Sequence, residues 1–291
     1  MNVLRLWPLR VLWILVPFTI GSVLDDALAH RVASLRVGGT IAFWALWAIT
    51  LVASLVPRVE TLTFVRIAMP AAVPVALWIT AVAGVSLTSV AGIVVALAVA
   101  FVVLLATVGE DFVNGSSYGD EHRMPLRPPA AMLAGPIPLA WACCVAGTCA
   151  GPLLLLAHVW IVGVIVTAVG GPVAVIAVRA LHQLTRRWVV FVPAGFVLHD
   201  HLALREPVLF ARGDIVSLGP ALQGTAARDL TAGAAGLALQ VDFAVPVEMV
   251  PSSANNDAVE LVGITQFLFM ASRPGHVLAA AEARRLPVEK A

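Results

Sequence analysis

His199, Asp200 and His201 are the consecutive residues of this chain that most resemble a chemical site. Imidazole and carboxylate groups bind divalent metal ions, and imidazole also exchanges a proton near neutral pH. Successive residues of a β-strand point to opposite faces, so the tripeptide offers at most two ligands on one face. Because no partner cluster is evident elsewhere in the sequence, we interpret it as a polar turn at the end of a strand.

Cys143, Cys144 and Cys149 lie within a single apolar run. Adjacent cysteines rarely pair with each other, and no histidine stands at metal-site spacing from these three. We therefore expect them to be small, polarizable packing residues of a membrane helix, with a redox or metal role as the alternative.

Three further ionisable residues, Asp25, Asp26 and His158, lie close to the expected ends of apolar segments. Carboxylates at membrane depth would indicate an ion path. At the end of a segment they are usually solvated or paired with a residue such as Arg31, and we expect His158 to occupy an interfacial position.

The sequence gives little sign of a catalytic motif. The HExxH and Walker-type phosphate-loop patterns are absent, and no acidic residue lies near the centre of the later apolar segments. Residues 115–119 match the letters of G-x-S-x-G, but Asn114, Gly115, Ser116 and Ser117 form a turn signal in a polar stretch rather than a strand-to-helix turn. We therefore assign no catalytic, cofactor-binding or metal-binding residue, and expect no cofactor.

The composition indicates a membrane protein. Apolar residues make up 60% of the chain, charged residues only 12%, and the mean hydropathy is +0.95. A globular domain in water carries roughly 25% charged residues, so this excess of apolar surface predicts contact with lipid. The net charge of +1 excludes nucleic-acid binding by bulk electrostatics. Arginine is common and Lys290 is the single lysine, which favours a high-GC bacterial source such as an actinobacterium.

Six segments are long and apolar enough to span a bilayer, which requires about 20 residues. They cover residues 9–23, 38–56, 64–83, 89–108, 130–150 and 152–181. Gly151 and Pro152 predict the break between the last two, and Gly170, Gly171 and Pro172 predict a kink in the sixth. A cleaved signal peptide is the alternative for the first segment, since Ala27, Leu28 and Ala29 resemble a cleavage site.

The distribution of arginines predicts the orientation in the membrane. With the N-terminus inside, nine arginines lie at inner loops and segment ends, whereas only Arg31 and Arg36 lie outside. The inner set comprises Arg5, Arg10, Arg58, Arg66, Arg123, Arg127, Arg179, Arg186 and Arg187. The positive-inside rule therefore places both termini in the cytoplasm of a cell with an inner, or plasma, membrane.

Small residues recur every four positions in segments three to six, which lets helix backbones approach closely in lipid. In an alanine-rich chain the same spacing also arises by chance. The positions are Ala72, Ala76, Thr80 and Gly84; Gly92, Ala96 and Ala100; Gly147 and Gly151; and Gly163, Thr167 and Gly171.

Near Arg186 the pattern changes, which predicts a transmembrane domain of residues 1–185 and a cytoplasmic domain of residues 186–291. Alternating apolar residues predict strands at 188–192, 196–199, 207–211, 215–218, 237–243, 247–250 and 259–270. A closing helix is expected to be capped by Ser272, to bury an apolar face that includes Leu278, and to hold Arg284 and Arg285 in its last turn.

Residues 188–200 and 267–274 resemble the first hairpin and the strand-to-helix junction of bacterial PH-like domains. The chain thus resembles actinobacterial polytopic membrane proteins with a C-terminal PH-like domain. The resemblance covers about a third of the chain and implies a β-barrel closed by a helix. From Arg186 onward there are nine basic and ten acidic residues, so anionic lipid binding is not predicted.

Two hypotheses for function follow. The first is a non-enzymatic membrane scaffold or accessory subunit whose cytoplasmic domain binds a membrane or cytoplasmic protein partner. The alternative is a component of a transporter, or a membrane enzyme, that acts on a lipidic substrate. The lack of buried charge and of catalytic motifs favours the first.

Overall fold

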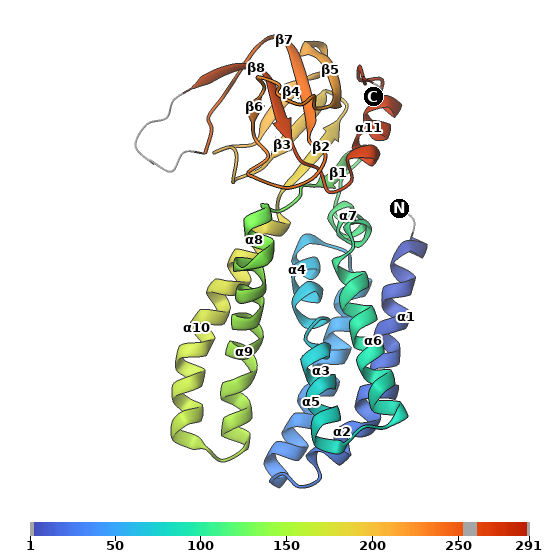
Figure 1. Cartoon of the computed structure of the whole chain (residues 1–291), viewed down its shortest axis with the longest axis vertical. Helices are drawn as coiled ribbons and strands as arrows, with labels where there is room; N and C mark the ends of the chain where they lie inside the picture. Colours follow the sequence, from blue (N-terminus) through green and yellow to red (C-terminus); the bar gives the residue numbers. More distant parts are fainter. Residues whose placement is uncertain (1–2, 253–260, 290–291) are drawn as a thin grey trace. The chain divides into compact units, whose positions relative to one another are not determined.

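Two compact units make up the chain, and the computed structural model describes residues 3–252 and 261–289 of it (Figure 1). The helical unit comprises Met1–Gly115 and Ile137–His182, and the β-rich unit comprises Ser116–Pro136 and Gln183–Ala291. Each unit is therefore built from two separate segments. The predicted division at residue 186 had placed Ser116–Pro136 with the membrane helices, whereas this polar segment belongs to the β-rich unit.

Among the described residues, six helices are long and apolar enough to cross a membrane, as the sequence predicts, and they indicate a multi-pass membrane protein. The six candidate spans are Trp7–Leu28, Ala33–Leu55, Val59–Ala83, Leu87–Leu104, Pro136–Leu156 and Trp160–Thr185. A short amphipathic helix, α7 (Ala106–Asn114), follows the fourth span. Large apolar side chains such as Phe101 and Ile176 point outward, which is the arrangement expected of helices in contact with lipid.

Two of the spans contain an irregular turn at a proline. The first consists of α1 (Trp7–Val16), a π-helical turn (Pro17–Gly21) and α2 (Ser22–Leu28), and a 3-10 turn (Val3–Leu6) precedes it. The third consists of α4 (Val59–Ala68) and α5 (Ala72–Ala83), which are separated by a turn that includes Pro70. Proline lacks an amide hydrogen and cannot complete the regular helical ladder, so the helix changes its winding there.

The second and fourth spans are uninterrupted helices, α3 (Ala33–Leu55) and α6 (Leu87–Leu104). α5 ends at Ala83 and is followed by its cap Gly84, whose φ of +94° favours glycine, and α6 begins at Leu87. The hydroxyl of Ser86 accepts a hydrogen bond from the Ser89 amide and closes the start of α6. The third and fourth spans are thus joined by a tight turn.

The predicted break at Gly151 and Pro152 is wrong. Both residues lie inside α9 (Pro136–Leu156), and the chain turns at residues 157–159 before α10 (Trp160–Thr185). A Cβ atom on Gly151 would lie 2.2 Å from the Thr167 hydroxyl, so this glycine serves close packing rather than a turn. Membrane helices tolerate an internal proline, and α10 likewise continues as one helix through Pro172.

Small residues form packing faces between the membrane helices at most of the positions that their spacing predicts, but a Cβ atom on Gly84 or Gly171 would meet nothing within 4 Å. Ala76 of α5 is 2% exposed and Ala96 of α6 is 0% exposed. A Cβ atom on Gly147 of α9 would lie 2.4 Å from the Gly170 carbonyl of α10, so the two backbones touch there. α9 and α10 run side by side in Figure 1. Small residues let helices approach where the bilayer supplies no hydrophobic force between them.

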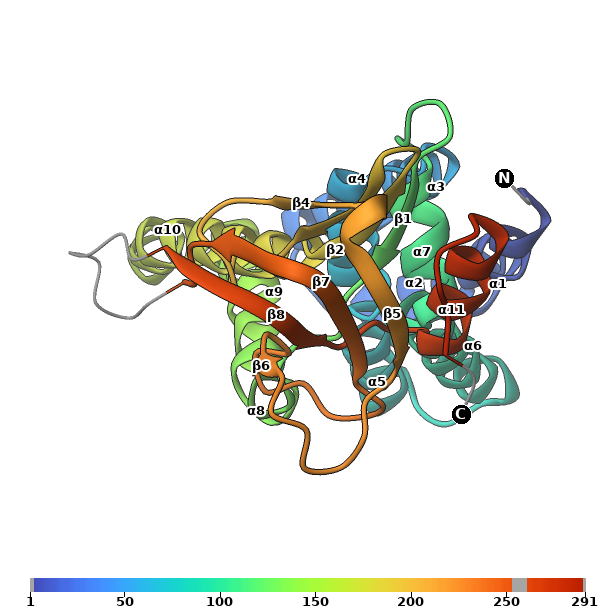
Figure 2. The same cartoon turned by 90° about the horizontal axis from the view of Figure 1, so that it is seen from above.

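The β-rich unit contains two four-stranded sheets. The first has the order β1 (His122–Pro125), β2 (Trp188–Val192), β3 (Gly195–His199) and β4 (Val208–Ala211), with all pairs antiparallel. The second has the order β5 (Ile215–Pro220), β7 (Leu239–Met249), β8 (Val262–Phe269) and β6 (Arg228–Asp229), with β6 parallel to β8. In Figure 2, β7 and β8 extend as a long ribbon with β5 beside β7.

The strand predictions are largely met. The strands expected at 237–243 and 247–250 form the single strand β7, which pairs with β8 through an irregularity between Asp242 and Val247. The final strand was expected to begin at Val259, but Val259 and Glu260 lie outside the described residues, and β8 begins at Val262.

Strand β1 comes from the polar segment that follows the fourth span. Pro125 pairs with Trp188 and His122 pairs with Phe191. Three backbone hydrogen bonds continue the attachment: Leu126 to Arg187 at 3.0 Å, Arg127 to Met270 at 2.9 Å, and Ser272 to Pro125 at 2.9 Å. A short helix, α8 (Ala130–Ala134), then leads to α9. The first sheet therefore needs both segments of the unit.

A set of phenylalanines fills the space between the two sheets: Phe191, Phe196, Phe210, Phe243, Phe267 and Phe269. The closing helix α11 (Pro274–Ala283) buries Val277 and Ala281 in this core. Leu278 is only partly buried, beside the positions that face inward. The predicted Ser272 cap is wrong, because Arg273 occupies the cap position and makes no capping side-chain hydrogen bond.

Candidate functional site

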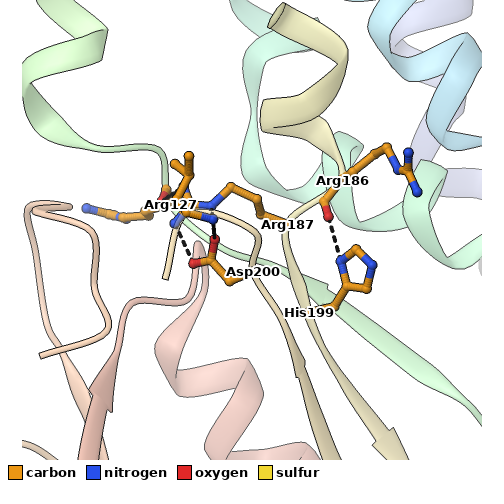
Figure 3. Close-up of polar contacts among 6 residues, drawn as sticks. Arg127, Arg186, Arg187, His199 and Asp200 are labelled. Carbon is orange, nitrogen blue, oxygen red and sulfur yellow. Dashed lines mark hydrogen bonds and ion pairs between the residues drawn. The ribbon is translucent and has the colours of Figure 1, made fainter. Parts of the chain in front are cut away.

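Arg187 and Asp200 form a buried ion pair in the β-rich unit (Figure 3). The Nε and Nη2 atoms of Arg187 donate hydrogen bonds to Oδ1 and Oδ2 of Asp200, both at 2.7 Å. The Nη1 atom of Arg187 donates to the carbonyl of Arg127 at 3.0 Å, and the amide of Leu202 donates to Asp200 Oδ1 at 3.0 Å. The guanidinium and the carboxylate are thus joined by two parallel hydrogen bonds, and each also has a backbone hydrogen-bond partner.

Because of this pair, Asp200, the central residue of the His-Asp-His sequence, is not available to bind a metal ion or to transfer a proton. Both carboxylate oxygens of Asp200 accept from Arg187, and its side chain is 0% exposed. Within the described part of the chain, His199, Asp200 and His201 do not gather into a group of metal ligands. The prediction of a polar turn at a strand end agrees with this placement, since β3 ends at His199.

Arg186 and Arg187, which are neighbours in sequence, have different surroundings. The side chain of Arg186 is exposed and points away from the ion pair in Figure 3, whereas Arg187 is 2% exposed. Only Arg186 keeps the environment expected of a residue beside a membrane helix end. A planar, permanently charged guanidinium suits the bidentate contact that Arg187 makes.

His199 packs against its cross-strand neighbour on the first sheet. Its ring stacks on Trp188, its cross-strand partner, with 4.8 Å between centroids, and its Nδ1 lies 2.9 Å from the Arg186 carbonyl oxygen. The guanidinium of Arg123 lies 5.7 Å from the Trp188 ring centroid and 3.1 Å from a carboxylate oxygen of Glu121. These cross-strand contacts stabilise the sheet and leave His199 with a structural role.

His201 lies half-buried in the turn after β3. Burial lowers the pKa of its imidazole below the ordinary value of 6.5, and the nearby charge of Arg187 acts in the same direction. The carboxylate of Asp200 opposes the change but does not outweigh burial. Burial therefore favours the neutral form of the His201 imidazole.

An arginine pocket opens elsewhere on the same unit, with a volume of about 430 Å³. We use this name for the pocket lined by Asp120, Val192, Pro193, Gly195, Arg212, Ala283, Arg284, Arg285 and Leu286. Its walls are the β2–β3 turn, the residue that follows β4, and the chain just beyond α11. Three arginines and one aspartate are among its lining residues, so its electrostatic character is basic.

Two arginines of this pocket are held by backbone carbonyls. Arg284 donates from Nη2 to the carbonyl of Asp120 at 2.9 Å, and its guanidinium lies 5.8 Å from the Phe191 ring centroid. Arg212 donates from Nη2 to the carbonyl of Arg284. Sequence reasoning had placed Arg284 and Arg285 in the last turn of the helix, whereas α11 ends at Ala283 and Arg284 is its C-terminal cap.

The site-like residues of the helical unit are dispersed. Asp25 and Asp26 are exposed at the end of α2, as expected of solvated carboxylates. His158 lies in the turn between α9 and α10, with its ring stacked on Trp160 and Nε2 2.9 Å from the Ser34 hydroxyl. The cysteines are unpaired: Cys144 is buried, Cys143 is half-buried and Cys149 is exposed.

Two arginines of the helical unit cap neighbouring membrane helices. Arg10 of α1 is buried and donates to the carbonyl of Ser54, near the end of α3, at 2.9 Å. Arg66 of α4 donates from Nε to the carbonyl of Val103, near the end of α6, at 3.4 Å. The last carbonyls of a helix lack amide partners and carry partial negative charge, so they accommodate a guanidinium. The sequence used both residues only as indicators of orientation.

No protein-family model, curated protein or solved structure matches this chain.

The arginine pocket is the accessible polar feature that sequence reasoning missed. Arg212 stands 72 positions before Arg284 in the chain, and only the fold brings the two together. One local signal was present: Arg285 follows the helix at a position where glycine is usual.

Proposed function

We propose that this protein is a non-enzymatic membrane scaffold or accessory subunit whose β-rich unit binds a protein partner. One observation carries the proposal. Asp200, the central residue of the sequence that most resembled a metal site, is held in the buried pair with Arg187, and His199 stacks on Trp188, whereas the arginine pocket faces solvent. A unit that keeps its polar groups for its own core and presents a basic pocket is suited to recognition.

The strand order supports a PH-like architecture for this unit. Four antiparallel strands β1 to β4 precede a second sheet that contains β5, β7 and β8, and helix α11 follows and packs on the core. Bent sheets closed by a C-terminal helix form a rigid frame for binding loops. We place the unit in the cytoplasm, because the arginine asymmetry puts both termini inside.

The alternative, a transport component or a membrane enzyme acting on a lipidic substrate, needs a polar cavity at membrane depth. A shallow pocket of about 460 Å³ in the helical unit is lined by Asp25, Ala29, Arg36, Val37, Thr40 and Ile41. These residues belong to the end of α2 and the first turns of α3, so the pocket lies at a helix connection rather than mid-span. This pocket therefore does not supply the cavity that the alternative needs.

Affinity capture of the full chain tests the proposal. The tagged protein is purified from native membranes in mild detergent after brief cross-linking, and co-purifying proteins are quantified by mass spectrometry against an unrelated six-span protein. We expect one or a few partners in near-stoichiometric amounts. Turnover of a lipidic substrate by the purified chain, with no enriched partner, would overturn the scaffold assignment.

A further inference from the structure

The charges of the arginine pocket are unbalanced at its surface. Arg212, Arg284 and Arg285 face one carboxylate, that of Asp120, among the lining residues. From Arg186 onward the chain has nine basic and ten acidic residues, so the three arginines are a local concentration rather than a sample of a basic surface. Such a concentration stabilises an anionic ligand.

The pocket is preorganised for that ligand. Arg284 donates to the Asp120 carbonyl and lies over the Phe191 ring, and Arg212 donates to the Arg284 carbonyl. A guanidinium carries five N–H donors, so one or two bonds to carbonyls leave others available to a ligand. Donors held in advance lose little conformational entropy when a carboxylate arrives.

Arg285 gives an independent indication of function. Its φ of +59° lies in the left-handed region, at the residue after the cap of α11. The Leu286 amide donates to the Ala281 carbonyl at 3.0 Å, a helix-ending pattern in which glycine is the usual left-handed residue. Here an arginine with an exposed side chain occupies the strained position. Strain kept at a pocket wall is characteristic of functional positions.

The lining also contains apolar side chains. Val192, Pro193 and Leu286 lie beside the three arginines, so the pocket offers apolar contact and anion recognition together. An inorganic anion uses only the arginines, and a lipid surface is attracted by a broadly basic face that this unit lacks. A peptide with alternating acidic and apolar side chains matches both parts of the lining.

We propose that the arginine pocket binds carboxylate side chains of an acidic, partly apolar peptide segment of the partner protein. The inference rests on the proposed function and specifies the chemistry of its partner. Arg212 and Arg284 supply fixed donors, and Arg285 supplies the guanidinium that is not engaged elsewhere in the described structure.

Fluorescence anisotropy tests this inference with the full chain in nanodiscs of uncharged phosphatidylcholine. The probes are a fluorescein-labelled peptide of alternating Glu and Leu, and the same peptide with Gln in place of Glu. We expect the Glu peptide alone to bind, with an affinity that falls as salt rises. Equal affinity for both peptides, or no binding of either, would overturn the inference.

Arg285→Gly separates binding from folding. Glycine relieves the left-handed strain, so the melting temperature should stay equal or rise, while affinity for the Glu peptide should fall about tenfold. Arg228→Ala removes an exposed arginine of β6, away from the pocket lining, and should leave affinity unchanged. Unchanged affinity in Arg285→Gly would overturn the role of the pocket.

Two further arms separate this inference from its alternatives. Flotation of the nanodiscs with phosphatidylglycerol vesicles that depends on Arg285, without peptide binding, would assign the pocket to lipid headgroups and overturn the peptide ligand. Affinity capture repeated with Arg285→Gly distinguishes a failure of this inference from a failure of the proposed function. If the variant retains the partner in full, the proposed function stands but the pocket is not the binding site.

Discussion

The Arg187 guanidinium donates two hydrogen bonds of 2.7 Å to the Asp200 carboxylate, and the two side chains are 1% and 0% exposed. Arg187 directly precedes β2 and Asp200 directly follows β3, so the pair closes the open end of that hairpin. The contact of Arg187 with the Arg127 carbonyl joins the segment after β1 to the same point. One buried pair therefore ties three parts of the chain together.

Breaking this pair should be strongly destabilising. Arg187→Met or Asp200→Leu alone leaves one uncompensated buried charge, and we expect a loss of about 3–5 kcal/mol. The double variant removes both charges and should recover most of the stability. Unfolding of the full chain in detergent, followed by tryptophan fluorescence, measures all three; the pair is not coupled if the single losses simply add.

The β-rich unit should require its separate N-terminal segment. A fragment of residues 183–291 lacks β1 and leaves an edge of β2 unpaired, so we expect aggregation or an unfolded spectrum. Joining Ser116–Pro136 to that fragment through a flexible linker should give a soluble, β-rich monomer by circular dichroism and gel filtration. A well-folded short fragment would show that β1 is dispensable.

His201 should make stability depend on pH. Because burial lowers its pKa in the folded state, the unfolded chain binds a proton more readily. The contribution of neutral, buried His201 to the free energy of unfolding is complete at a pH above the ordinary pKa of 6.5 and declines as the pH falls below that value. Unfolding measured at about pH 7.5 and about pH 5.5 should show a smaller difference in His201→Gln than in the natural protein. An unchanged difference would exclude this residue as the cause.

Ala76 and Ala96 should not accept a large side chain. Both are buried between membrane helices, and replacement of either with Phe should overpack the interface at a cost of about 1–3 kcal/mol. Leu77→Phe is the matched control, because Leu77 is 52% exposed on the neighbouring face of α5. Thermal unfolding in detergent compares the three variants. A larger loss in the control would contradict the assigned packing faces.

Reporter fusions test the predicted orientation. The arginine asymmetry predicts that a cytoplasm-dependent reporter fused after Ala291 is active and that a periplasm-dependent reporter there is silent. Fusions in the connection between α3 and α4 should behave in the same way. Fusions between α5 and α6 should give the opposite result.

The sequence by itself determined the class of this protein. Long uncharged runs can satisfy their backbone groups in lipid only as helices, so hydropathy predicted six spans from local information. The spacing of the small residues likewise predicted Ala76 and Ala96 as packing positions, and both are buried. Alternating apolar residues predicted most strands after Trp188, because one face of each strand must be buried.

Only the tertiary structure decided which polar residues are buried and which are accessible. Asp200 looked like a site residue, but its partner Arg187 stands thirteen positions earlier, and the ion pair depends on the β2–β3 hairpin. Strand β1 was hidden in a polar loop because its partner β2 lies more than sixty residues later. The arginine pocket needs Arg212 and Arg284 to meet across the fold. Contacts between residues distant in sequence are set by chain topology, which local patterns do not encode.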